Sequence, residues 1–98
     1  MILVTGSILA RADSVDEALA LSLEHVRRSR TEPGCISHAV HRDAEDPLRL
    51  VFVEQWADHA ALLAHFAVPS SRAFARAAGA LAAEPPTLQI YDAQAVAL

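Results

Sequence analysis

The clearest secondary-structure signal in the chain is a β-strand that covers residues 48–56. Its centre, Leu50-Val51-Phe52-Val53, is apolar at every position, whereas a strand places successive side chains on opposite faces of its sheet. Both faces must therefore be covered by other parts of the protein. Alternation separates Leu50, Phe52, Glu54 and Trp56, which we expect to face helices and a pocket, from Val51, Val53 and Gln55 on the other face.

The rest of the chain alternates between strand and helix patterns that end at breaker residues, such as Glu32-Pro33-Gly34 and Pro85-Pro86. The expected strands cover residues 2–10, 35–42, 48–56 and 87–96, and the expected helices cover 15–30, 59–66 and 71–82. This β-α-β-β-α-α-β order is that of the ferredoxin-like, split βαβ α+β fold, which packs helices on one face of a four-stranded antiparallel sheet. With 98 residues, the chain has room for a single domain, residues 1–98.

Each expected helix starts beside a residue that is suited to capping. Ser14 and Glu17 have the spacing of a capping box at the start of the first helix. Asp58 precedes the second helix, and Ser70 precedes the third, after Pro69 has ended the second.

The second face of the predicted sheet lacks a cover in this arrangement. Leu3 and Leu9 of the first strand and Val51 and Val53 of the third are expected there. A monomer would expose this apolar face to water, and such a face usually marks an interface. We therefore expect a homodimer in which two sheets pack face to face.

The amino-acid composition argues against several classes of function. The chain has no lysine and no asparagine, so a Schiff base on a side chain is excluded, and any side-chain carboxamide must come from Gln55, Gln89 or Gln94. A net charge of −4 with dispersed arginines argues against nucleic-acid binding. No apolar run approaches the ~20 residues of a membrane span, and no signal peptide is evident at the start. We expect a cytoplasmic protein.

Four short motifs together resemble those of the antibiotic biosynthesis monooxygenase family. They are Glu32-Pro33-Gly34-Cys35, Asp43 with Asp46-Pro47, Val53-Glu54-Gln55-Trp56-Ala57-Asp58, and Ala61-Leu62 with His65. The resemblance implies a dimeric α+β barrel with a pocket between sheet and helices in each protomer. Characterised relatives oxidise quinols or anthrones with molecular oxygen and neither metal nor flavin, while others degrade haem or isomerise small metabolites.

The candidate catalytic residues are His65, His38 and Trp56. His65 shares a helix face with Leu62 and should point inward, where an imidazole is suited to deprotonating a phenol; alternatively, it bonds Glu54 or a backbone carbonyl. His38 faces inward by alternation and is a second candidate base. Trp56 either stacks on an aromatic substrate or is a core residue.

The candidate substrate-binding residues are Ser7, Phe52, Glu54, Phe66, Phe74 and Tyr91. The aromatic residues among them suit a pocket wall or the core equally well, and Glu54 alternatively serves as a buried structural carboxylate. Arg72 is placed either at the pocket mouth, where it would recognise an acidic substituent, or on a solvated face. His25 and His59 are expected in solvent.

A metal site is not expected from these histidines. His38 and His41 lie on opposite faces of a strand, and His59 and His65 are about 240° apart around a helix. Haem degradation is also disfavoured, because the haem-degrading relatives use an asparagine and this chain has none.

We therefore expect a cofactor-independent monooxygenase that oxidises a quinol or a related phenolic or anthrone-type molecule with O₂. The alternatives are a non-catalytic dimeric module that binds ligands, for example in a stress response, and an isomerase of a small metabolite.

Overall fold

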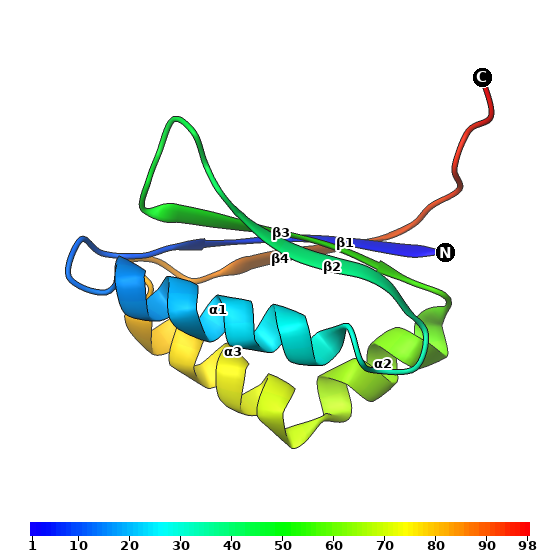
Figure 1. The fold of residues 1–98 in the computed structure, drawn as a ribbon, viewed down its shortest axis with the longest axis horizontal. Helices are drawn as coiled ribbons and strands as arrows, with labels where there is room; N and C mark the ends of the chain where they lie inside the picture. The colour runs from blue at the N-terminus through cyan, green and yellow to red at the C-terminus, as the bar shows by residue number, and fades with distance from the viewer.

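The structure is a computed structural model that describes residues 1–98. Its strands are β1 (Ile2–Leu9), β2 (Cys35–Arg42), β3 (Arg49–Trp56) and β4 (Thr87–Asp92), and its helices are α1 (Val15–Ser29), α2 (His59–Ala67) and α3 (Pro69–Leu81). The strands form one antiparallel sheet in the order β2-β3-β1-β4, and all three helices lie on one face of it (Figure 1). The predicted ferredoxin-like α+β fold is confirmed.

Two boundaries differ from the prediction by more than one residue. β4 ends at Asp92 and not at residue 96, because it pairs only with β1, whose first residue, Ile2, is the partner of Asp92. α3 begins at Pro69, one residue before the expected cap Ser70, and the residue before it, Val68, is the N-cap. Proline is well suited to this first position because the first helical N–H has no intrahelical partner to lose.

The predicted capping box at the start of α1 is wrong. The Ser14 hydroxyl does not cap the helix; it accepts a hydrogen bond from the Arg11 N–H at 3.0 Å and donates one to the Leu81 carbonyl at 2.8 Å. Ser14 thus ties the start of α1 to the end of α3. Asp58 does cap α2, because its carboxylate accepts from the Ala61 N–H at 2.8 Å.

The helix-facing side of the sheet carries two separate apolar clusters. One is centred on Ile8, Leu50 and Phe52 and the other on Ile2, Val4, Trp56 and Leu62. Between Phe52 and Trp56 on this face lies Glu54, and β2 pairs His38 directly opposite it. A row of polar side chains therefore crosses the sheet between the two apolar clusters.

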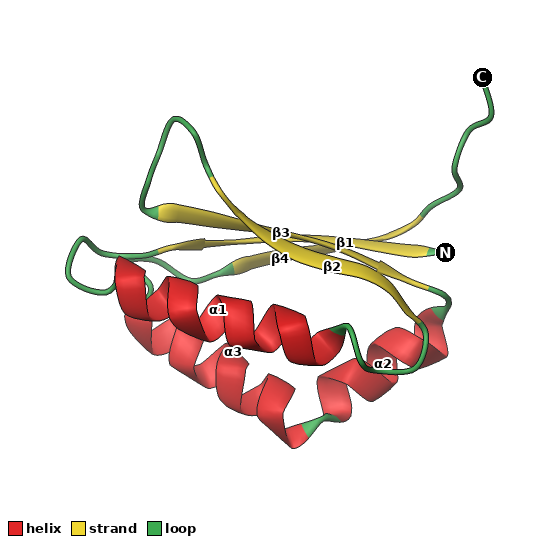
Figure 2. Cartoon of the chain, in the orientation of Figure 1, coloured by secondary structure: helices red, strands yellow, loops and turns green.

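The opposite face of the sheet has no cover within the chain (Figure 2). Leu3 and Val51 are half-buried there, and Val53 is exposed. Tyr91 pairs with Leu3 and shares this face. No helix is long and apolar enough to cross a membrane.

Candidate active site

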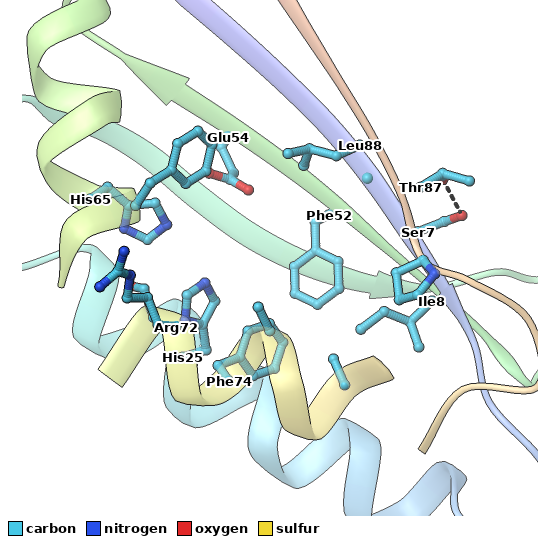
Figure 3. A pocket seen from close by; sticks show the side chains of 16 residues that line it. Ser7, Ile8, His25, Phe52, Glu54, His65, Arg72, Phe74, Thr87 and Leu88 are labelled. Atoms are coloured by element: carbon cyan, nitrogen blue, oxygen red, sulfur yellow. Dashed lines mark hydrogen bonds between the residues drawn. The ribbon is translucent and has the colours of Figure 1, made fainter. Parts of the chain in front are cut away.

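A cavity of about 270 Å³ lies between the sheet and the helices. His25, His65 and Arg72 lie at one end, where Phe74 stacks on His25, and Phe52 and Ile8 continue the wall toward the other end (Figure 3). The volume is at the small end of ligand-binding pockets, so the cavity suits a small molecule with one apolar and one polar edge.

His65 reaches this cavity from α2 with a defined orientation. Its Nδ1 lies 2.8 Å from Oε1 of Glu32, which belongs to the turn after α1. An ionised carboxylate only accepts hydrogen bonds, so Nδ1 carries the proton, and in the neutral ring Nε2 then keeps a lone pair. His65 therefore presents a basic nitrogen, although its partner is Glu32 and not the Glu54 or backbone carbonyl considered from the sequence.

Gly34 allows the Glu32 turn to approach α2. Its φ is +81°, which is a conformation that L side chains rarely adopt. A Cβ at this position would lie 2.5 Å from the Cβ of Ala61 on α2. The Glu-Pro-Gly-Cys motif thus brings the carboxylate to the helix that carries His65.

Glu54 holds a negative charge at the centre of the site. Its Oε1 accepts from Nε1 of Trp56 at 2.9 Å and lies 3.1 Å from Nε2 of His38. Burial alone would raise the pKa of Glu54, but the contact with His38 and the hydrogen bond from the indole N–H of Trp56 outweigh it, so the pKa is lowered from its usual value. The carboxylate therefore remains ionised.

His38 and Trp56 do not border the cavity. His38 is only 2 % exposed, and neither of its ring nitrogens has a well-aligned hydrogen-bond partner. Trp56 is fully buried, with its ring centroid 4.6 Å from that of His65. Both residues support the site from behind, and Trp56 is in the position of the core residue considered as its alternative.

Five of the six predicted substrate-binding residues border the cavity: Ser7, Phe52, Glu54, Phe66 and Phe74. The side chain of Ser7 nevertheless lies on the uncovered face of the sheet, because the register pairs Ser7 with Val51, and its hydroxyl contacts Thr87 at 3.0 Å. Tyr91 does not border the cavity, because the register places it on the uncovered face too, where its hydroxyl donates to Gln89 at 2.7 Å.

His25 was expected in solvent, and this prediction is wrong. It is 6 % exposed, borders the cavity, and stacks on Phe74 with ring centroids 4.1 Å apart. Burial, followed by the nearby His38, His65 and Arg28, lowers its pKa to about 3. The imidazole is therefore neutral at physiological pH.

Hydrophobic periodicity did not predict the burial of His25, because small and polar residues share the buried face of α1 with Val26. Ala18, Ser22, His25 and Ser29 lie on it, and the two serines satisfy their hydroxyls by donating to carbonyls of the same helix, each at 2.7 Å. The spacing of the small residues Ala18, Ser22 and Ser29 (i, i+4 and i+11) is the sequence signal that could have predicted the buried face with His25.

Three histidines from α1, β2 and α2 meet at the polar end. Ligand nitrogens of His25, His38 and His65 lie within 4.8 Å of one another. The prediction from sequence compared only histidines of the same strand or helix and therefore could not reveal this cluster. A tetrahedral zinc site with Zn–N bonds of about 2.0–2.1 Å would need nitrogens roughly 3.3 Å apart. Moreover, Arg28 Nη2 lies 2.8 Å from His25 Nδ1, which puts the proton of His25 on its other nitrogen. The rings could therefore hold a metal only after rearrangement.

Comparison with known proteins agrees with this architecture. The family model for antibiotic biosynthesis monooxygenase matches residues 1–77, and the chain belongs to this family. A crystal structure of an antibiotic biosynthesis monooxygenase is 29% identical, with a TM-score of 0.89 over 97% of this chain and 100% of that one. The structure of Rv0793 from Mycobacterium tuberculosis is 23% identical, with a TM-score of 0.90 over 99% of this chain and 98% of the other, and shares the fold.

A curated relative has no assigned activity. The uncharacterised protein sll1783 of Synechocystis is 37% identical over 90 residues, which are 92% of this chain. The chain spans 61% of the length of that relative.

Proposed function

We propose that the chain is a monooxygenase that oxidises a small quinol or related phenolic compound with molecular oxygen and without a cofactor. The observation that carries the proposal is the lone pair on Nε2 of His65, which is oriented by Glu32 toward a largely apolar cavity. Membership of the monooxygenase family supports the general class of reaction.

The first step is removal of the proton from a phenolic hydroxyl. The proton moves to Nε2 of His65, and the electron pair stays on the substrate oxygen. The resulting imidazolium keeps its Nδ1–H on the Glu32 carboxylate, 2.8 Å away, and this contact stabilises the positive charge. Positioned bases of this kind accelerate proton transfer by about 10²–10⁴-fold.

The phenolate then supplies the electrons for oxygen chemistry. It transfers an electron to O₂, and recombination places one oxygen atom on the ring while the second leaves as water. For a hydroquinone the products are a hydroxyquinone and water, so the substrate provides all four electrons. Phe52, Phe74 and Ile8 along the cavity wall exclude water from the reactive anion.

We also propose that a second copy of the chain covers the open face of the sheet. Leu3, Val51 and Val53 lie on that face and none of them is buried, while the helices occupy only the opposite side (Figure 1). A symmetric sheet-on-sheet dimer would bury these side chains without disturbing the cavity.

Oxygen uptake with a panel of hydroquinones in buffer containing a chelator tests the enzymatic proposal. His65→Gln should reduce the rate by roughly 100-fold. His59→Gln is the matched control, because His59 lies on the same helix but is exposed and contacts Asp92. Ligand-induced thermal stabilisation without turnover would instead indicate a binding module, and product formation with unchanged oxygen would indicate an isomerase.

A further inference from the structure

The contact between His25 and Arg28 defines which nitrogen of His25 faces the cavity with a proton. Arg28 Nη2 lies 2.8 Å from His25 Nδ1. A guanidinium only donates hydrogen bonds, so Nδ1 must accept, and a neutral ring then carries its hydrogen on Nε2. His25 is therefore a hydrogen-bond donor through Nε2.

Neighbouring residues fix this arrangement. Phe74 stacks on the His25 ring at an interplanar angle of 9°, which sets the plane of the imidazole. Ser71 lies 3.3 Å from the same Nη2 of Arg28 and holds the guanidinium in place. The low pKa of His25, about 3, keeps the ring neutral across the physiological range.

His65 has the opposite polarity at the same end of the cavity. Its Nδ1–H is engaged by Glu32, so its Nε2 accepts. The two ring centroids are 5.3 Å apart, both residues border the cavity, and no protein group bonds either Nε2 atom. One donor and one acceptor thus face the same small space (Figure 3).

We propose that His25 binds the oxygen of the substrate hydroxyl and of the anion that forms from it. The hydroxyl would accept from His25 Nε2–H and donate to His65 Nε2. When the proton moves to His65, the electron pair remains on the oxygen, and the hydrogen bond from His25 becomes charge-assisted and stronger. This inference rests on the proposed function and adds the residue that binds the substrate oxygen, with a preference for a free acidic hydroxyl over its ether.

Binding of 4-nitrophenol tests the role of His25 without turnover, because the absorbance of this probe distinguishes phenol from phenolate. The wild-type chain should lower the pH at which the bound probe ionises and should bind the phenolate more tightly than 4-nitroanisole, which lacks the hydroxyl. His25→Phe keeps a ring to stack on Phe74 but removes the N–H. It should weaken phenolate binding by about tenfold or more and leave 4-nitroanisole binding unchanged, and His25→Gln should restore part of the difference.

The proposal is overturned if the wild-type chain binds the phenolate no better than 4-nitroanisole, a comparison that needs no variant to fold. It is also overturned if folded His25→Phe ionises the probe as the wild type does. Oxygen uptake is measured separately with hydroquinones. A phenolate shift without oxygen uptake would therefore refute the oxygenase and retain the role of His25.

Discussion

Two buried imidazoles with opposite hydrogen-bonding roles give the cavity its chemical character. Glu32 makes His65 an acceptor and Arg28 makes His25 a donor. Neither role depends on the identity of the histidine alone, because each is imposed by a charged residue on the far side of the ring. Glu32 and Arg28 are therefore positioning residues for a reaction that they do not touch.

Glu32→Gln tests this positioning. The neutral amide stabilises the His65 imidazolium less than a carboxylate does, so kcat for hydroquinone oxidation should fall by about 10-fold to 100-fold with little change in KM. Steady-state oxygen uptake measures both constants. Glu45→Gln, in the exposed turn before β3, is the control and should leave both unchanged; a Glu32→Gln effect confined to KM would contradict the assigned role.

The titration of His25 predicts a pH dependence of stability. Its pKa is 6.5 in the reference state and about 3 in the folded chain, so between these values the unfolded state binds more protons. Above pH 6.5 the titration of His25 does not change the free energy of unfolding. As the pH falls from 6.5 toward 3, this titration lowers the free energy of unfolding by up to about 1.4 kcal/mol per pH unit. Urea unfolding from pH 7 to pH 4 should show a shallower loss for His25→Phe than for the wild type. Equal slopes would contradict the assignment.

The order and facing of the elements follow from local patterns. Alternation in β3 placed Phe52, Glu54 and Trp56 on the helix side, as the structure shows. Phe52 and Glu54, the cavity residues of β3, could therefore be predicted. His25 could not, because its helix buries small and polar residues beside Val26, and hydrophobic periodicity gives no signal for the polar ones. The partner of His65 was also missed, since Glu32 is 33 positions away and their contact depends on the approach of a turn to α2.

That turn can be tested through its glycine. Gly34→Ala would force a Cβ against Ala61 at a φ of +81° and should destabilise the fold by about 1–3 kcal/mol. Gly79→Ala in α3 meets nothing within 4 Å and should stabilise the chain by roughly 0.5–1 kcal/mol, as expected for alanine in a helix interior. Urea unfolding measures both changes, and two effects of the same sign would contradict this description of the turn.

At the scale of the whole molecule, the two faces of the sheet have different surroundings. The helix-facing side contains the cavity, and the other side exposes Val53 to 36% with no cover from the chain. The uncovered face could be predicted from the alternation of residues 48–56, whereas the volume and lining of the cavity could not, because they depend on how the sheet and the helices meet.

Val53→Arg should dissociate the proposed dimer, since it would bury an unpaired charge between the two sheets. Light scattering at micromolar concentration should give a dimer for the wild type and a monomer for this variant. Leu63→Arg is the control, because Leu63 is 66% exposed on α2, away from the sheet. A wild-type monomer would contradict the proposal.

The central claim is that a phenolic anion formed at His65 reacts directly with oxygen. Incubation with ¹⁸O₂ and a hydroquinone in metal-free buffer, followed by mass spectrometry, tests it most directly. The account predicts one labelled oxygen atom in the ring product and the second in water, with labelled product forming roughly 100-fold more slowly from His65→Gln. A product without label, or labelled product formed by His65→Gln at the wild-type rate, would contradict it.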